Sequence, residues 1–405
     1  MSAAAPTQLM NTKPLFKLMV EKKASDLFFT CNAPVKIKIE GKIFPVNKQI
    51  LTPETVRQAA LGLMTQDQIE YFNEELEIDF AISETGLGRF RVNVFYQRGY
   101  PAMVLRYITA DMPRLEDLGM PEILKDLVML KRGLILMVGA AGAGKSTTLA
   151  AMLNYRNETS SDHILTIEDP IEFLHSNKKS IVNQREVGLD TKSYARALRS
   201  AVRSAPDVIL VGEIRDRETM EIALTAGETG HVVYSTLHTI SAGQTINRIL
   251  GMFSQEEEEQ VRERLVGCLR YIISQRLVPK IGGGRLLVTE LMGSSLRSRE
   301  VISLGENENR QLSEIIESGN VAGWHSFEQS LLGAFENNLI TEETALLNSV
   351  NKSQMHRLVD QVKKKIETSQ IAHGLKMRRE EPQPLFKITP SMPVPPVKEP
   401  AGIST

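Results

Sequence analysis

The stretch from Gly139 to Ser146 has the residue types that bind a nucleoside triphosphate. Its sequence, Gly-Ala-Ala-Gly-Ala-Gly-Lys-Ser, fits the pattern G-x-x-x-x-G-K-[ST] of a phosphate-binding loop. Small residues let backbone N–H groups close around phosphate oxygens, Lys145 reaches the β- and γ-phosphates, and the Ser146 hydroxyl is a ligand for Mg²⁺. We therefore predict nucleotide contacts from Gly139, Ala140, Ala141, Gly142, Ala143, Gly144, Lys145, Ser146 and Thr147.

The segments on either side of this loop favour a genuine site. Residues 133–138 form a short apolar run of the kind that buried strands show, and residues 147–154 are rich in good helix formers. Strand, glycine loop and helix is the order that phosphate binding requires. The alternative is a chance turn rich in Gly and Ala, which neither flank supports.

A second apolar strand supplies a candidate general base. Residues 208–211 are Val-Ile-Leu-Val, followed by Gly212 and Glu213. A fully apolar strand is typical of the centre of a parallel sheet, so we expect it beside the strand that precedes the loop. Hydrolysis needs an acid that orients water, and Glu213 is our candidate. The alternative is a glutamate at a strand end on the protein surface.

Two further strands end in polar groups. Residues 164–167 precede Glu168 and Asp169, and residues 232–237 precede His238. Ligands lie at the carboxyl edge of a parallel sheet, so we predict that Glu168 takes part in catalysis and that His238 senses phosphate. Ser146, Glu168 and Asp169 are the predicted Mg²⁺ ligands, directly or through water. Asp169 before a proline is also typical of a simple turn, and a lone histidine is more often structural.

Composition narrows the class of protein. The chain has 405 residues, 48 basic and 49 acidic, with a net charge of −1, so no general electrostatic case exists for binding nucleic acid. Two cysteines, Cys31 and Cys268, indicate a reducing compartment and cannot form a four-cysteine zinc site. No apolar run approaches 18 residues, so no membrane helix is predicted. We expect a cytoplasmic protein whose membrane association comes through partners.

Periodicity and turn residues suggest five segments. Alternating strands at 36–40 and 89–95 indicate a small α+β domain over 13–110, and a connection with Pro and Gly follows at 111–122. Strands and helices alternate over 123–290, which indicates an α/β nucleotide domain. A helical region is expected over 291–377, and a disordered proline-rich tail over 378–405.

Helices are predicted to dominate from about residue 254 onward. Ser254 and Glu257 have the spacing of a capping box, which marks a helix start. The apolar residues Val261, Leu265, Leu269, Ile272 and Leu277 then suggest one amphipathic stripe.

Four of these motifs together resemble a known family. Residues 139–146, 164–173, 207–216 and 228–239 are similar to the Walker A, Asp box, Walker B and His box of the secretion ATPases. The resemblance covers roughly 13–365, and it implies a PAS-like N-terminal domain, a RecA-like ATPase core with a helical C-terminal portion, ATP and Mg²⁺, and a homohexamer. The chain has neither the longer N-terminal region nor the four-cysteine motif of the assembly ATPases, so it looks like the PilT/PilU retraction branch.

The resemblance also implies residue roles and partners. Arg91 and Arg106 match family arginines on the N-terminal domain that approach the nucleotide and join Glu213, Glu168 and His238 in catalysis; arginines on an outward strand face are the alternative. The implied partners are a PilT-like retraction ATPase and the platform protein of the inner membrane, which place the chain at the inner face of that membrane at the pilus base. No direct nucleic-acid partner is expected.

One departure favours an accessory role within that branch. The stretch 294–303, Ser-Ser-Leu-Arg-Ser-Arg-Glu-Val-Ile-Ser, differs from the Ala-Ile-Arg-Asn-Leu-Ile-Arg-Glu motif that retraction motors of the PilT kind carry. Two alternatives stay open: an adaptor that binds ATP without hydrolysing it and supports a PilT-like hexamer, and a RecA-like nucleic-acid motor.

Overall fold

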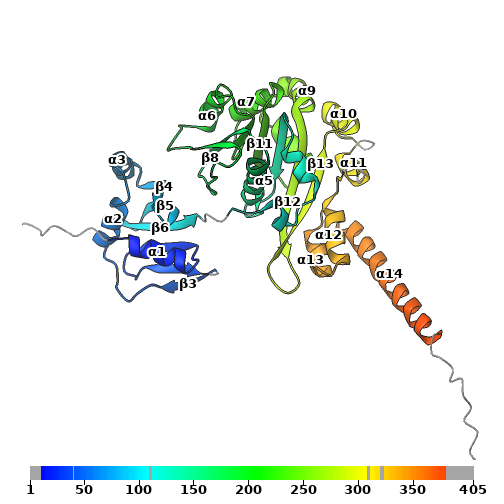
Figure 1. Cartoon of the computed structure of the whole chain (residues 1–405), viewed down its shortest axis with the longest axis horizontal. Helices are drawn as coiled ribbons and strands as arrows, with labels where there is room; N and C mark the ends of the chain where they lie inside the picture. The colour runs from blue at the N-terminus through cyan, green and yellow to red at the C-terminus, as the bar shows by residue number, and fades with distance from the viewer. Residues whose placement is uncertain (1–10, 40, 109–111, 308–310, 320–322, 380–405) are drawn as a thin grey trace, which may run out of the picture. The chain divides into compact units, whose positions relative to one another are not determined.

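A six-stranded antiparallel sheet forms the first part of the chain, in the computed structural model that describes residues 11–39, 41–108, 112–307, 311–319 and 323–379. The strand order is β3-β2-β1-β6-β5-β4. Figure 1 draws this part of the chain in blue and cyan. Its strands are β1 (Asp26–Thr30), β2 (Lys36–Ile39), β3 (Lys42–Pro45), β4 (Glu77–Glu84), β5 (Gly88–Gln97) and β6 (Tyr100–Ile108). The strands predicted near 36–40 and 89–95 are thereby confirmed.

Three helices accompany this sheet: α1 (Lys13–Glu21), α2 (Pro53–Leu61) and α3 (Gln66–Glu75). Helix α2 begins with a capped first turn, because the Thr52 side chain accepts the Thr55 N–H and Pro53 opens the first turn. Phe16 of α1 stacks on Phe90 of β5 with their ring centroids 4.6 Å apart, and both side chains are fully buried. This part of the chain therefore has a hydrophobic core of its own.

A seven-stranded sheet forms the second part, in the order β13-β12-β7-β11-β10-β8-β9. Its strands are β7 (Gly133–Val138), β8 (His163–Glu168), β9 (Ile181–Glu186), β10 (Val208–Val211), β11 (Val232–Leu237), β12 (Leu269–Pro279) and β13 (Arg285–Gly293). All neighbours pair in parallel except β12 and β13. The order corrects one expectation: β10 does not lie beside β7, because β11 is inserted between them.

Helices cover both faces of this sheet. They are α4 (Ile123–Val128), α5 (Lys145–Thr159), α6 (Tyr194–Ala201), α7 (Arg217–Glu228), α8 (Ala242–Leu250) and α9 (Glu258–Cys268), with short 3₁₀ turns η1 (Leu115–Leu118) and η2 (Gln255–Glu257). Leu134 and Leu136 of β7 pack with α6, α7, α8 and α9, whereas Ile135 and Met137 pack with α4 and α5. Every residue of β7 is buried, which explains its unbroken apolar sequence.

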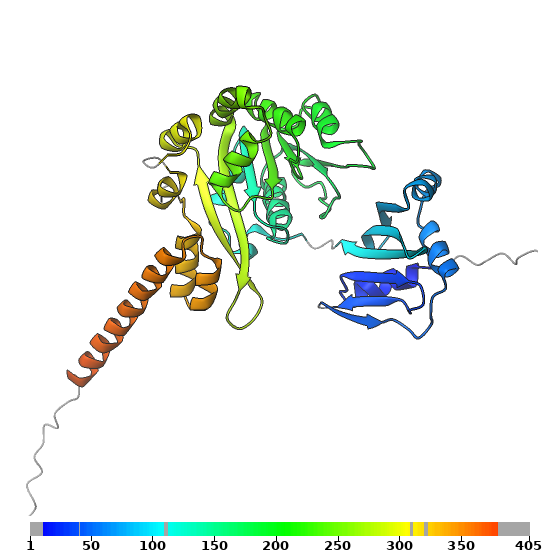
Figure 2. The same cartoon turned by 180° about the vertical axis from the view of Figure 1, so that it is seen from behind.

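The predicted helical stripe through Leu277 is wrong beyond Cys268. Val261 and Leu265 lie on α9, but Leu269, Ile272 and Leu277 belong to β12. Strand β12 pairs in parallel with β7 and antiparallel with β13, and the long ribbon that β12 and β13 make is seen in yellow-green in Figure 2. Apolar residues at helical spacing continue by chance from the helix into the strand, so periodicity alone does not reveal the boundary.

The region after β13 is helical, as expected. It contains α10 (Leu296–Leu304), α11 (Leu312–Ser318), α12 (Phe327–Glu336) and α13 (Glu342–Asn348). Helix α14 (Lys352–Arg379) belongs to a separate unit that starts at residue 351. The predicted proline-rich tail lies outside the described residues from 380 onward. Among the described helices, none combines the length and apolar character that crossing a membrane demands.

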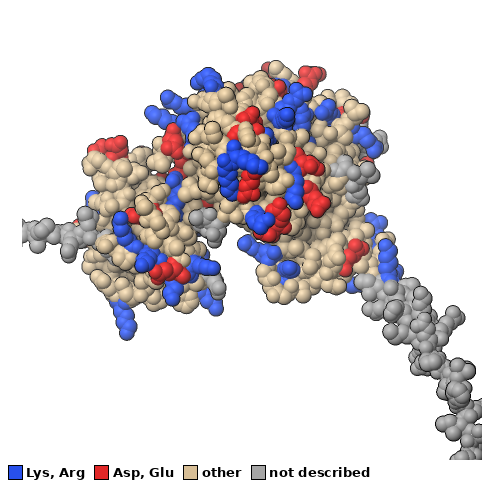
Figure 3. All heavy atoms as spheres, viewed as in Figure 1, with Lys and Arg blue, Asp and Glu red and all other residues tan. Residues whose placement is uncertain are grey.

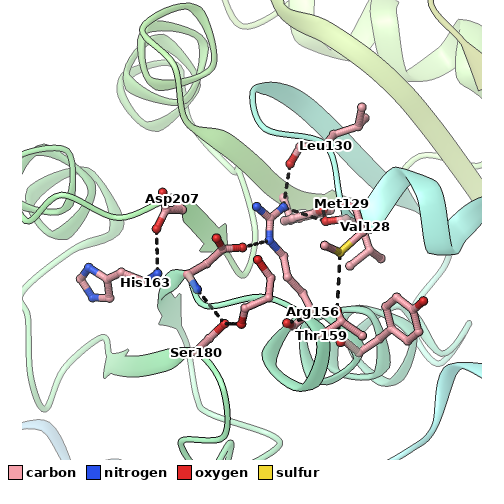
Figure 4. A network of polar contacts seen from close by, with 12 residues as sticks. Val128, Met129, Leu130, Arg156, Thr159, His163, Ser180 and Asp207 are labelled. Carbon is pink, nitrogen blue, oxygen red and sulfur yellow. Dashed lines mark hydrogen bonds and ion pairs between the residues drawn. The ribbon is translucent and has the colours of Figure 1, made fainter.

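A buried arginine ties the far end of α5 to the start of the sheet (Figure 4). Arg156, only 4% exposed, donates from Nε to Asp162 at 2.6 Å and from Nη1 to the carbonyls of Val128 and Leu130, both at 2.7 Å. The Asp162 N–H in turn donates to the Ser180 hydroxyl at 3.1 Å. Because the phosphate loop enters α5 at its other end, this network fixes the helix that carries the loop.

We expect Arg156→Met to lower the free energy of unfolding by about 3 kcal/mol, because it leaves a largely buried Asp162 without its cation and removes one donor from each of the Val128 and Leu130 carbonyls. Denaturant unfolding measures the change. Arg199→Met is the matched control: Arg199 pairs with Glu218, both side chains are more than half exposed, and its loss should cost less than about 1 kcal/mol. Equal losses in the two variants would contradict the role of Arg156.

Candidate nucleotide-binding and hydrolysis site

The predicted phosphate loop connects β7 to α5, as its sequence requires. Its glycines have positive φ angles of 152° at Gly139, 77° at Gly142 and 88° at Gly144, a conformation that side chains disfavour. Gly139 has a second constraint, since a Cβ built there would lie 2.5 Å from the carbonyl oxygen of Gln275. The loop can therefore keep this backbone conformation only when position 139 is a glycine.

Gln275 braces the loop from the neighbouring strand β12. Its side-chain Nε2 donates to the carbonyl of Ala143 at 2.6 Å, and the residue is 1% exposed. Turning that carbonyl toward β12 leaves the loop's N–H groups available for phosphate. No sequence motif indicates Gln275, because it is distant in sequence from the loop and belongs to a segment predicted to be helical.

Lys145 lies at the centre of a pocket of about 270 Å³ that forms around the loop. Its ammonium donates to the carbonyls of Gly139 at 2.7 Å and Ala140 at 3.2 Å. Burial lowers the pKa of Lys145, while the carboxylates of Glu213 and Glu172 act in the opposite direction. The pocket also brings together Ser146, Glu168, Asp169, Glu213 and His238. The parallel strand ends meet here, as ligand sites in such sheets do.

Glu213 follows β10 and has two polar partners. Its Oε2 accepts from Nε of Arg215 at 2.7 Å, and its Oε1 lies 3.3 Å from Nε2 of His238. Arg215 also lies 3.9 Å from Asp169. The His238 side chain is half-exposed. His231 lies at the opposite end of β11, where its Nδ1 is 3.2 Å from the carbonyl of Ala226.

Glu168 ends β8 and points into the pocket with a restrained carboxylate. Its Oε1 accepts from the Thr166 hydroxyl at 2.6 Å and from Gln184 Nε2 at 3.1 Å. Burial raises the pKa of Glu168, and these hydrogen bonds oppose that rise. The next residue, Asp169, is exposed. The two neighbouring carboxylates therefore lie in different environments.

The donor set fits Mg²⁺ bound together with nucleotide. The described residues contain no group of three His, Cys, Asp or Glu side chains that could hold a metal ion by themselves. Mg²⁺ seldom uses such a cage, because it keeps several waters and binds one or two carboxylates plus substrate phosphates. Ser146 together with Glu168 or Asp169 supplies that smaller set in one pocket.

Arg91 and Arg106 lie opposite each other on β5 and β6. Arg91 makes a two-pronged ion pair with Asp79, and Arg106 donates to Asp26 at 2.9 Å. Both arginines also line a hollow of about 250 Å³ with Thr147 and residues 170–173, beside the loop that carries Glu168 and Asp169. They thus lie near the end of the phosphate loop, with their charges held by partners on the first sheet.

Other residues of the pocket were missed by the sequence analysis. Tyr194 of α6 and His175 line it, and burial lowers the pKa of His175 to about 4 so that its ring is neutral near pH 7. Neither residue belongs to a sequence motif that predicts a nucleotide-binding site. Arg215, two residues after Glu213, was close enough in sequence to be suspected.

Comparison with known proteins agrees with this geometry. The family model described as "Type II/IV secretion system protein" matches residues 5–286. The type IV pilus ATPase PilU of Pseudomonas aeruginosa is 44% identical over 86% of this chain and 91% of its own length. The chain belongs to the type II/IV secretion system protein family.

Other members of this secretion family extend the match. The type IV pilus retraction ATPase PilT of Pseudomonas aeruginosa is 43% identical over 83% of this chain and 97% of its own length. A crystal structure of the pilus retraction motor PilT with bound ADP superposes with a TM-score of 0.80, covering 86% of this chain and 99% of that chain at 43% identity. The resemblance to the PilT/PilU branch is confirmed, and the protein is an ATPase that binds adenine nucleotides.

We expect Gly139→Ala to weaken nucleotide binding by this secretion-family ATPase by at least about tenfold, since a Cβ at Gly139 must displace either the loop or β12. Titration with a fluorescent ADP analogue measures the affinity. Gly267→Ala in α9 is the matched control, because a Cβ at Gly267 meets nothing within 4 Å. Wild-type affinity in Gly139→Ala would contradict the close approach to Gln275.

Proposed function

We propose that the protein is an accessory motor of the type IV pilus machinery, which assists pilus retraction together with a PilT-like ATPase. The observation that carries the proposal is the match to PilU and PilT over most of the chain, combined with a site that contains Lys145, Glu168 and Glu213 in one pocket. The accessory role is supported by the stretch 294–303, which departs from the motif of independent retraction motors. Twitching motility is the corresponding cell behaviour.

The chemistry assigned to this site is hydrolysis of the γ-phosphate of ATP. A water oxygen attacks the γ-phosphorus, the bond to the bridging oxygen of ADP breaks, and Glu213 accepts the proton of the water. Lys145 and the loop N–H groups hold the phosphates, and His238 is close enough to Glu213 to register the change in charge. Ser146 with Glu168 or Asp169 would hold Mg²⁺, which would supply positive charge to the phosphates.

The domain plan proposed for the motor follows the two sheets. Residues 13–110 form the N-terminal domain, 111–122 the linker, 123–290 the ATPase core and 291–377 the helical region. We assign Arg91 and Arg106 to stabilising the transferred phosphoryl group when these domains close in a homohexamer. The two guanidinium groups pair with Asp79 and Asp26. On closure each guanidinium group exchanges its carboxylate for phosphate oxygens.

The expected location is the cytoplasmic face of the inner membrane at the pilus base, reached through the platform protein.

A nucleic-acid motor is the less favoured alternative. Acidic and basic side chains are interspersed in the view of Figure 3, and the chain carries 48 basic and 49 acidic residues. A strand-binding protein needs a continuous basic groove. Strong stimulation of ATP turnover by single-stranded DNA would reverse this preference.

We expect Lys145→Ala to abolish ATP turnover, because it removes the cation that holds the β- and γ-phosphates. We expect Glu213→Gln to keep binding of a fluorescent ADP analogue within a few-fold of wild type while turnover falls at least about 100-fold, the usual contribution of a general base. Phosphate release measures turnover. Turnover at the wild-type rate in Glu213→Gln would remove Glu213 from the role of base.

Purified wild-type protein that binds ATP but never hydrolyses it, even with its PilT-like partner, would favour the alternative of a non-hydrolysing adaptor that supports a PilT-like hexamer.

In cells, the accessory role predicts that pilus retraction is lost without the PilT-like ATPase even when this protein is present. Pilus retraction scored by fluorescence microscopy in strains lacking either protein, or both, tests the dependence. The strain lacking only this protein should retract pili with reduced force or frequency. Retraction that persists without the PilT-like ATPase would make this protein an independent motor.

A further inference from the structure

The loop of residues 169–178 after Glu168 is held by side chains of β9 and α5. Glu186 accepts the Ile171 N–H, Asn157 accepts the Lys178 N–H, and Gln184 holds the segment between them. Gln184 donates from Nε2 to the carbonyl of Phe173 at 2.8 Å, and its Oε1 accepts the backbone N–H of His175 at 2.8 Å. Phe173 and His175 both line the nucleotide pocket. The amide of Gln184 thus fixes the backbone of the part of the loop that forms the pocket wall.

The same amide also contacts the Glu168 carboxylate. Gln184 Nε2 lies 3.1 Å from Glu168 Oε1, the oxygen that also accepts from the Thr166 hydroxyl. Thr166 on β8 and Gln184 on β9 are paired in the parallel register, which brings both donors to one side of the carboxylate. Two donors from adjacent strands therefore fix one oxygen of Glu168.

Only a primary amide satisfies all three contacts. Nε2 supplies two N–H groups, for Glu168 and Phe173, and Oε1 supplies the acceptor for His175. A carboxylate at this position would keep the acceptor but lose both donors and lie against the Glu168 carboxylate. A methionine would have similar length but could not make these hydrogen bonds.

We propose that Gln184 is a positioning residue for ATP hydrolysis, which fixes the Glu168 carboxylate and the 173–175 wall of the pocket in their working orientation. The inference rests on the proposed role of Glu168. Catalytic groups need to be held within a fraction of an ångström, and their supporting partners are commonly worth about 10- to 100-fold in activity. Gln184 does not itself belong to the phosphate-binding loop or to the carboxylates of the site.

The test compares five single variants of the full-length protein: Gln184→Met, Gln184→Glu, Thr166→Val, Glu168→Gln and Asn183→Met. Asn183 is the matched control, because it lies next to Gln184 on β9, is exposed and contacts His163 instead of the pocket. ATP turnover gives kcat and KM, a fluorescent ADP analogue without Mg²⁺ gives nucleotide affinity, and thermal melting reports folding. The double variant Thr166→Val with Gln184→Met tests whether the two donors act on the same carboxylate.

We expect both Gln184 variants to lower kcat by about 10- to 100-fold while KM and analogue affinity stay within about threefold of wild type. Asn183→Met should keep the wild-type kcat. Losses in the double variant should fall short of the product of the single losses, since both donors serve one group. Should Gln184→Met fail to fold, Gln184→Glu, which keeps the acceptor for His175, decides the question.

Three results would overturn the inference. One is a wild-type kcat in a folded Gln184 variant while Glu168→Gln is inactive, which leaves the proposed function intact. Another is a loss of kcat that comes with a similar fold-loss of analogue affinity and with a lower melting temperature. That result indicates a structural role only. The third is wild-type turnover in Glu168→Gln, which removes the proposed role of Glu168 and the inference together.

Discussion

A run of parallel strands that is buried on both faces determines where the phosphate loop and the polar strand ends of the site lie. Strands β7, β8, β10 and β11 run in the same direction, so their carboxyl ends meet at one edge. Helices on both faces exclude water from the strands but leave that edge open, because the loops to the next helices begin there. Residues separated by about a hundred positions in sequence thereby share one pocket. The chemistry depends on this arrangement more than on any single contact.

Partners restrain most of the charges around the pocket. Glu213 contacts Arg215 and His238, Glu168 accepts from Thr166 and Gln184, and Lys145 donates to loop carbonyls. Such pairing lowers the cost of burying ionised groups and limits their motion. The arginines of β5 and β6 follow the same principle, since Asp79 and Asp26 hold them beside the pocket.

The sequence was informative wherever function constrains neighbouring residues. The phosphate loop, the strand ends at Glu168, Glu213 and His238, and the start of α2 depend on local patterns of small, apolar or capping residues. The neighbour of β10 could not be predicted, because strand order depends on crossovers that no local pattern encodes. Gln275 and Gln184 were missed for a related reason: a glutamine becomes informative only when the sheet brings it to a carbonyl or a carboxylate that is distant in sequence.

Strand β12 has a consequence beyond closing the sheet. It pairs with β7 from Leu269 to Ser274 and with β13 from Tyr271 to Pro279, so both of its edges are occupied just before Gln275. Gln275 near its middle touches the phosphate loop, while just beyond its end the N–H of Ile281 donates to the carbonyl of Leu339 at 2.9 Å, in the turn that follows α12. One continuous strand and the turn that follows it therefore connect the phosphate loop with the C-terminal helices.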